Sequence, residues 1–374
     1  MIFLHIYNMH KKTFFLQKTR KKEKIINSIL TQNRFMRYNI LYLFYFFTET
    51  EGAFMYYIGV DLGGTNIAIG IVNEKFEIVK KGSVPTKPER GADAIIVDMA
   101  SLSKKLLKEM GSSLSEVKYA GVATPGTANS ETGVVEYANN VPFDQYPLAD
   151  KLSSLLDGIP VYIENDANAA AKAEAIAGVA SGAPISVMIT LGTGLGGGIV
   201  IDGKVYSGFN FAGGELGHIV IERGGKPCTC GRKGCWEAYS SATGLVNMTK
   251  EHLADARKAG RKTLIDDMVG DDLSKISART AFNAMKEGDA VGAEIVDEYI
   301  SYLACGIVNV INIFQPNVLV IGGGVCNEGD NLVRPLLEKV YAETYSREGT
   351  PRTEIKIAKL GNDAGIIGAA VLGK

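Results

Sequence analysis

From residue 55 onward, short apolar runs alternate with longer segments whose apolar residues recur at helical spacing. The runs end at glycine or polar residues, as buried strands do, and predict strands at 56–60, 67–72, 76–80, 117–123, 161–163, 187–191, 198–201, 318–321 and 355–360. The helical spacing predicts helices at 92–110, 166–178, 245–258, 281–286, 289–314 and 363–372. Strands that alternate with helices indicate an α/β fold.

One strand–turn–strand pattern occurs twice. In the first copy, the strand ending at Val60 runs into a turn at 61–65, and in the second, the strand ending at Leu191 runs into a turn at 192–194. Two copies of one unit predict two related lobes with a cleft between them, where ligands commonly bind. We expect a smaller lobe at 55–172 with 360–374, and a larger lobe at 173–359.

Residues 1–54 differ in composition from the rest of the chain. They contain no Val, Pro or Asp, and Phe, Tyr, Ile, Asn and Lys supply 28 of the 54 residues. We interpret them as translated upstream sequence from an AT-rich genome, or a disordered extension, with Met55 as the true start. Three alternatives fit less well. The apolar stretch 39–47 is shorter than the ~20 residues that span a bilayer, no convincing signal-peptide cleavage site follows it, and 25–43 shows no clear DNA-binding helix-turn-helix pattern.

Charge and cysteine content narrow the classes of function. The formal net charge of the 374-residue chain is −1, which gives no bulk electrostatic reason to expect nucleic acid as a partner. No membrane partner is expected either. Cys305 and Cys326 lie in apolar segments and are interpreted as reduced, buried thiols. Because the other three cysteines cluster together, the sequence predicts no disulfide framework, which favours a reducing cytoplasm.

One histidine and the remaining three cysteines lie in a short segment: His218, Cys228, Cys230 and Cys235. One imidazole and three thiols form a set that closes a tetrahedral zinc site. Glu215 and Glu237 frame this segment. We therefore predict a loop that is held by structural zinc and presents carboxylates to a ligand.

Several residues in or near this loop are assigned structural roles. We interpret Trp236 as a packing anchor and His252 as an exposed histidine of a polar helix. The basic residues around the loop are interpreted as solvated charges: Arg223, Lys226, Arg232 and Lys233.

The two glycine turns suit a phosphate ligand. Glycines let backbone N–H groups point at an anion, and hydroxyl or amide side chains add donors. The first turn offers Asp61, Gly63, Gly64, Thr65 and Asn66, and the second offers Gly192, Thr193 and Gly194. A carboxylate at a strand end orients hydrated Mg²⁺ well. Neither turn matches the P-loop pattern, so a P-loop fold is disfavoured.

The segment Glu164-Asn165-Asp166 follows a strand and opens a helix. Asn and Asp are favoured helix N-caps, which is one interpretation. A carboxylate at such a junction in a cleft is also well placed to accept a proton from a substrate hydroxyl, and phosphoryl transfer needs little more than such a base, positioning and charge neutralisation.

Five segments together resemble the ROK family, named after repressor, open reading frame and kinase. They are 163–168, 191–198, 213–218, 228–237 and 241–244, and the resemblance extends over essentially all of 55–374. It is strongest to the bacterial glucokinases of the family. The resemblance implies a two-lobed, actin-like (ribonuclease H-like) sugar-kinase fold whose interlobe cleft closes over MgATP and a sugar.

The resemblance also implies roles for individual residues. Asp166 becomes the general base that takes the proton from the 6-hydroxyl of glucose. The sugar-binding positions are Asn165, Glu215, His218, Glu237, Gly126 and Asn140. The nucleotide positions are Asp61, Gly63, Gly64, Thr65, Gly192, Thr193 and Gly194 at the phosphates, with Gly322, Gly323 and Gly324 at the adenosine. A zinc-bound His218 keeps its second ring nitrogen for a sugar hydroxyl.

Other functions stay open. A ROK kinase for N-acetylmannosamine, N-acetylglucosamine or fructose shares most of these motifs, and polyphosphate is an alternative phosphoryl donor to ATP. A sugar-responsive transcriptional repressor of the same family needs an N-terminal DNA-binding module, for which residues 1–54 give no readable pattern. Family members are commonly homodimers or homotetramers.

Overall fold

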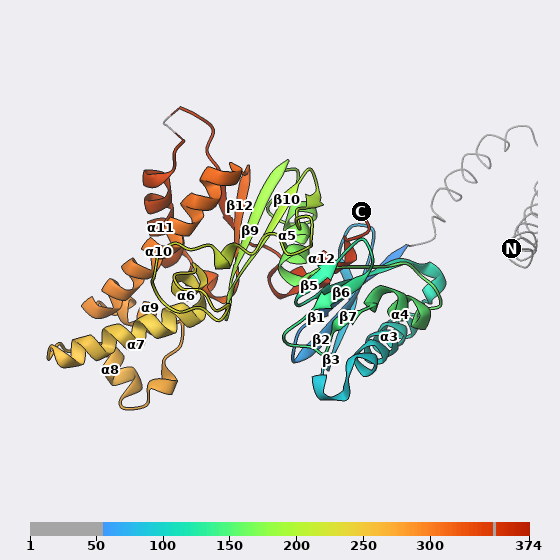
Figure 1. The fold of residues 1–374 in the computed structure, drawn as a ribbon, viewed down its shortest axis with the longest axis horizontal. Helices are drawn as coiled ribbons and strands as arrows, with labels where there is room; N and C mark the ends of the chain where they lie inside the picture. Colours follow the sequence, from blue (N-terminus) through green and yellow to red (C-terminus); the bar gives the residue numbers. More distant parts are fainter. Residues whose placement is uncertain (1–54, 347–348) are drawn as a thin grey trace, which may run out of the picture. The chain divides into compact units, whose positions relative to one another are not determined.

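The computed structural model describes residues 55–346 and 349–374, so the interpretations of residues 1–54 lie outside the described residues. Two five-stranded sheets share one arrangement (Figure 1). In each, three antiparallel strands are followed by two strands parallel to the central one. This is the arrangement expected from the repeated strand–turn–strand pattern. Within the described part of the chain, no helix is both long and apolar enough to cross a membrane.

The first sheet has the strand order β3-β2-β1-β4-β8. Its strands are β1 (Tyr56–Leu62), β2 (Asn66–Val72), β3 (Ile78–Pro85), β4 (Val117–Thr124) and β8 (Val161–Asn165). Because successive side chains of a strand point to opposite faces of the sheet, the side chains of β1 pack into two different layers. Ile58 and Val60 face a core built with α3 (Ala92–Glu109) and α4 (Leu148–Leu155). Tyr57 packs instead with residues of α12 (Ala364–Ala370), and Asp61 lies on that same face.

The second sheet has the order β11-β10-β9-β12-β13. Its strands are β9 (Ile185–Leu191), β10 (Leu195–Ile201), β11 (Lys204–Val205), β12 (Val318–Gly322) and β13 (Glu354–Ile357). The same alternation operates in β9. Val187 and Ile189 face a large helical layer, whereas Met188 packs with α5 (Asp166–Ile176).

The helical layer on the second sheet supports residues 218–235, the segment that carries the predicted metal ligands (below, the metal-binding segment). Its helices are α6 (Glu237–Ser240), α7 (Ala242–Lys258), α8 (Leu264–Val269), α9 (Thr280–Lys286), α10 (Ala290–Phe314) and α11 (Asp330–Glu343). Trp236 is fully buried in this layer, which confirms it as a packing anchor. Its indole lies against Gly306 of α10, where a Cβ would come within 2.0 Å of the ring. Only glycine allows that contact.

Helices α5 and α12 lie between the two sheets and pack against each other (Figure 1). Their approach to the strands is very close, because a Cβ on Gly198 would lie 2.8 Å from the Ala167 carbonyl oxygen and one on Gly121 would lie 1.8 Å from that of Ala369. At Gly121 and Gly198 the missing side chain therefore makes room for a helix.

Two predicted strand boundaries also need correction. The strand expected at 76–80 begins at Ile78, because the Asn73 side chain accepts N–H bonds from Lys75 and Glu77 and extends the turn. The strand expected at 355–360 ends at Ile357. A small antiparallel sheet of β5 (Thr127–Asn129), β6 (Val134–Tyr137) and β7 (Asp144–Tyr146) was not predicted.

Candidate active site

A cleft of about 1070 Å³ is lined by both sheets and by α5. It brings together most of the predicted site residues: Asp61, Asn66, Gly126, Asn140, Asp166, Gly192, Gly194, Glu215, His218, Glu237, Gly322, Gly323 and Gly324. Residues from distant stretches of the chain thus meet at one cavity. The predicted sugar and nucleotide residues that do not line it are Gly63, Gly64, Thr65, Asn165 and Thr193.

Three of these five residues lie next to residues of the cleft or of a neighbouring groove. The N–H of Gly63 donates to the Asn66 carbonyl at 2.9 Å and closes the first turn. Gly64 lies against Asn140, because a Cβ there would come within 3.1 Å of the Asn140 Cβ. Thr193 lines a neighbouring groove with Thr229.

Asn165 caps the helix that carries Asp166. Its Oδ1 accepts the N–H groups of Ala167 and Asn168 at 2.9 and 3.3 Å, as an N-cap side chain does. Its Nδ2 donates to the Gly126 carbonyl at 3.1 Å. The capping interpretation therefore holds for Asn165.

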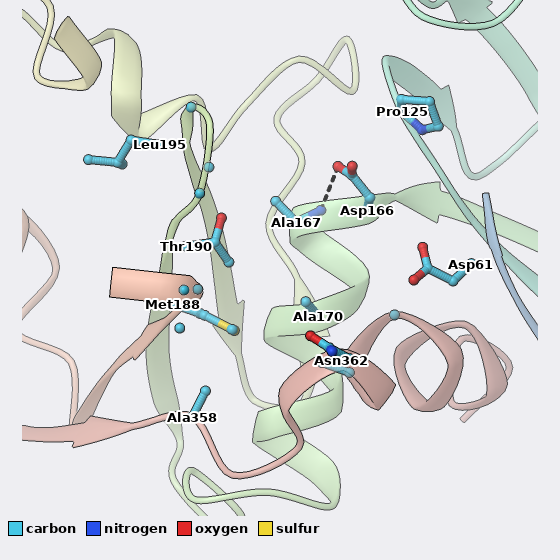
Figure 2. A pocket seen from close by; sticks show the side chains of 18 of the residues that line it. Asp61, Pro125, Asp166, Ala167, Ala170, Met188, Thr190, Leu195, Ala358 and Asn362 are labelled. Carbon is cyan, nitrogen blue, oxygen red and sulfur yellow. Dashed lines mark hydrogen bonds between the residues drawn. The ribbon is translucent and has the colours of Figure 1, made fainter. Parts of the chain in front are cut away.

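Asp166 is the first residue of α5 and points into the cleft, as Figure 2 shows. Its Oδ1 accepts the Ala167 N–H at 2.8 Å. Burial raises its pKa, while hydrogen bonds from the backbone and from Asn165 act in the opposite direction. A raised pKa makes the carboxylate a stronger proton acceptor than an ordinary aspartate.

Glu164 supports the same junction, a role that the sequence did not predict. It is buried, and its Oε1 accepts the Asn165 N–H at 2.9 Å and the Asn168 Nδ2–H at 3.1 Å. Burial raises its pKa. Its position in the strand next to Asp166 was visible in the sequence, but the two bonds that fix Asn165 and Asn168 were not.

Asp61 lies beside Asp166 in the cleft (Figure 2). Burial, and secondarily the charge of Asp166, raise the pKa of Asp61 to about 6. Its carboxylate rests on Gly365, where a Cβ would come within 2.4 Å. A cation between or beside two neighbouring carboxylates with raised pKa values stabilises their charged forms, so this donor set fits hydrated Mg²⁺.

We expect Asp61→Asn to stabilise the ligand-free protein above pH 6. The folded protein keeps the Asp61 proton up to about pH 6, whereas the unfolded chain releases it near pH 3.8. Ionisation therefore destabilises the folded state as pH rises between these values, by at most about 3 kcal/mol. Thermal denaturation from pH 4 to 8 measures this. The melting temperatures of variant and wild type should converge near pH 4 and differ at pH 8. Equal differences at both pH values, or a similar gain in the exposed-site control Glu131→Gln, would contradict it.

The second glycine turn is held by α7 and by Glu237. Thr243 Oγ1 donates to the Thr193 carbonyl at 2.7 Å, and the Ala242 N–H donates to the Gly192 carbonyl at 2.9 Å. Glu237 Oε2 accepts the Leu195 N–H at 2.9 Å. The turn is thereby fixed in place before any ligand arrives.

The four predicted metal ligands lie together, with their ligand atoms all within 4.8 Å of one another. Cys230 Sγ is 3.6 Å from Cys235 Sγ, and Cys228 Sγ is 3.6 Å from His218 Nδ1. Ligand atoms about 2.1–2.3 Å from a tetrahedral zinc ion lie about 3.6–3.8 Å apart. The donor set and these two distances fit zinc.

The metal-binding segment reaches the cleft through His218 and Glu237. His218 Nδ1 contacts Cys228, so Nε2 is the nitrogen left for a ligand. The two Glu237 oxygens face different groups. Oε2 binds the glycine turn through Leu195, and Oε1 lies 3.5 Å from the Thr229 hydroxyl.

Two of the structural roles predicted near this loop are wrong. His252 is half-buried and its Nε2 lies 2.8 Å from Glu298, in place of the expected free surface position. Lys226 pairs with Glu251 at 2.6 Å and lies over the Tyr239 ring. Both partners come from segments remote in sequence, which the local pattern could not show.

Known proteins resemble this chain over nearly all of its described part. A glucokinase from Halalkalibacterium halodurans is 39% identical over 324 residues, which cover 85% of this chain and 95% of that protein. An N-acetyl-D-glucosamine kinase from Aliivibrio fischeri is 33% identical over 328 residues, which cover 85% and 99%. A crystal structure of a ROK family glucokinase from Streptomyces griseus, in complex with glucose and AMPPNP, gives a TM-score of 0.68 at 32% identity and covers 84% and 98%. These likenesses confirm the expected two-lobed sugar-kinase fold, and residues 57–374 match the family model directly. The chain therefore belongs to the ROK family.

Proposed function

We propose that this chain transfers a phosphoryl group from ATP to the 6-hydroxyl of glucose. The class of activity, an ATP-dependent hexose kinase, follows from the glucokinase relatives and the ROK kinase structures. The observation that supports the detailed proposal is the cleft itself. The Asp166 carboxylate, at the start of α5 and with a raised pKa, lines this cleft together with Glu215, His218, Glu237 and glycines of the second turn.

Asp166 is proposed as the general base. Its raised pKa favours proton uptake, and its place at the first turn of α5 fixes the carboxylate through the Ala167 N–H. Glu164 and Asn165 hold the junction on both sides, so the base needs no rearrangement before it accepts the hydroxyl proton.

Charge neutralisation on the phosphates is assigned to the glycine turns and to a cation. Mg²⁺ bound with ATP supplies positive charge where the transferring group develops negative charge. Asp61 is the carboxylate proposed to hold this cation through water. Gly192 and Gly194 line the same cleft and leave room for phosphate oxygens next to their backbone. Gly322, Gly323 and Gly324 are the proposed adenosine-side positions.

Sugar recognition is assigned to the metal-supported side of the cleft. Glu215, His218 and Glu237 line the cleft on this side. Gly126 and Asn140, which come from an earlier part of the chain, line it as well. We propose that zinc is structural, since all four positions of a tetrahedron are filled by protein ligands and none is left for a substrate. Zinc would fix the His218 ring so that Nε2–H donates to a sugar hydroxyl.

Another hexose is the second candidate substrate, because the Aliivibrio fischeri relative is an N-acetyl-D-glucosamine kinase at 33% identity. A coupled kinase assay with glucose, N-acetylglucosamine, N-acetylmannosamine and fructose, each with ATP or polyphosphate, tests the proposal. We expect the highest kcat/KM for glucose with ATP. If kcat/KM is higher for an acetamido sugar, that sugar replaces glucose as the proposed substrate. Failure to phosphorylate any sugar would overturn the proposal.

We propose that residues 55–172 with 360–374 form one lobe and that residues 173–359 form the other. We also propose a homodimer or homotetramer, as in the family. The proposed location is the cytoplasm, where ATP is supplied and thiols stay reduced. Size-exclusion chromatography with light scattering tests the oligomeric state. A monomer at micromolar concentration would contradict it.

A further inference from the structure

We propose that Glu174 is a positioning residue that ties the cleft wall at 358–365 to the helix carrying Asp166. The inference deepens the proposed kinase function and rests on it. Glu174 takes no part in the chemistry described above. It lies on α5 eight residues after Asp166, about 12 Å along the helix.

The Glu174 carboxylate is fully buried and is satisfied by backbone N–H groups. Oε1 accepts from both Lys359 and Leu360 at 2.8 Å, and Oε2 accepts from Val179 at 2.9 Å. Gly178 makes room for it, since a Cβ there would lie 1.9 Å from Oε2. Burying a carboxylate is costly unless its hydrogen bonds are made, so these contacts hold one another in place.

Lys359 and Leu360 belong to the connection between the two sheets. The chain leaves the second sheet at the end of β13, Ile357, and enters α12, which packs on the first sheet. Residues on both sides of the clamp line the cleft: Ile357, Ala358, Gly361, Asn362, Ala364 and Gly365. The clamp also explains why the strand ends early, because the N–H groups of 359 and 360 turn to Glu174.

One helix therefore fixes two things. Its first turn presents Asp166, and its last turns hold the connection that forms the wall near Gly322–324. If the two N–H bonds are lost, this wall can shift relative to Asp166 while α5 stays packed on α12. We expect such a shift to weaken phosphoryl-donor binding and leave sugar contacts, which come from other segments, nearly unchanged.

Leu360→Pro tests the clamp against Leu360→Ala as its matched control. Leu360 has φ −80°, within the range of proline, so the substitution removes the N–H and sets the ring Cδ against the Glu174 carboxylate, which breaks the clamp. Both variants lose the Leu360 side chain, and only the proline variant loses the bond to Glu174. Relative to the alanine variant, we expect the KM for ATP to rise about tenfold and the sugar Kd to change less than about twofold. Equal KM values for ATP in the two variants would overturn the proposal.

Glu174→Gln and Glu174→Ala separate positioning from stability. The glutamine keeps an oxygen for Lys359 and Leu360 but sets an NH₂ group against the Val179 N–H. We expect it to lower the melting temperature while keeping the KM for ATP close to wild type, whereas the alanine raises that KM. A KM that follows the melting temperature across the variants would indicate a merely structural role and contradict the proposal.

Hydrogen exchange gives a readout that needs no substrate. We expect the amides of Lys359 and Leu360 to exchange at least about 100-fold faster in Glu174→Ala than in wild type, with core strand β1 unchanged. Unchanged exchange rates at both amides would show that Glu174 does not hold this segment. If wild type phosphorylates no sugar, the proposed function fails, and the exchange result still decides whether Glu174 holds this segment.

Discussion

Asp166→Asn is expected to lower kcat about 10³-fold and leave the sugar Kd within about threefold of wild type. Asparagine has nearly the same shape and retains an oxygen for the Ala167 N–H, so the start of α5 should keep its structure. It cannot accept the hydroxyl proton. A 10³-fold loss corresponds to about 4 kcal/mol of transition-state stabilisation. Single-turnover kinetics with saturating sugar and ATP measure the loss, and calorimetric titration measures the sugar Kd.

Asp289→Asn is the matched control for Asp166→Asn. Asp289 is also an aspartate at a helix start, where it caps α10 by accepting the Gly292 N–H, but it lies outside the cleft. We expect it to change stability and leave kcat unchanged. Near-normal turnover in Asp166→Asn, or an equal loss of kcat in Asp289→Asn, would contradict the assignment of Asp166 as the general base.

The residues that could be predicted from the sequence are those whose role follows from local pattern. Asp61 and Gly192 stand at the ends of apolar runs, so strand geometry alone brings them to the sheet edges. The ligands from His218 to Cys235 are close in sequence and of one chemical kind. For such residues the cleft and the metal cluster were foreseeable.

The rest depends on contacts between distant segments. In the sequence, Glu174 is a polar residue of an alanine-rich helix without any sign of a special role. Its hydrogen bonds to Lys359 and Leu360 join segments about 185 residues apart and are seen only in the structure. The glycines at 121 and 198 make room for helices α12 and α5, whereas Gly192 and Gly194 line the cleft. Sequence pattern cannot separate these uses, since both need a missing side chain.

Removal of the metal is expected to weaken sugar binding about tenfold or more and nucleotide binding less than about threefold. His218 and Glu237 lie in or next to the metal-held segment and line the cleft, whereas the adenosine-side glycines belong to β12 and the turn after it. Cys230→Ser should reproduce the effect of chelation. Cys305→Ser is its control, because Cys305 is a half-buried thiol of α10 outside the cluster. Metal content should be one zinc per chain in wild type and in Cys305→Ser, and much lower in Cys230→Ser.

The binding data distinguish a local effect from unfolding. Trp236 is the only tryptophan of the chain and follows Cys235 directly, so its fluorescence reports on the metal-binding segment. Glu237 also holds the second glycine turn through the Leu195 N–H, which predicts a small, secondary loss of nucleotide affinity when the segment loosens. A sugar Kd that rises while the nucleotide Kd barely moves supports a metal that shapes the sugar side of the cleft. Equal losses of both, with a broadened thermal transition, would instead show that the metal stabilises the whole lobe.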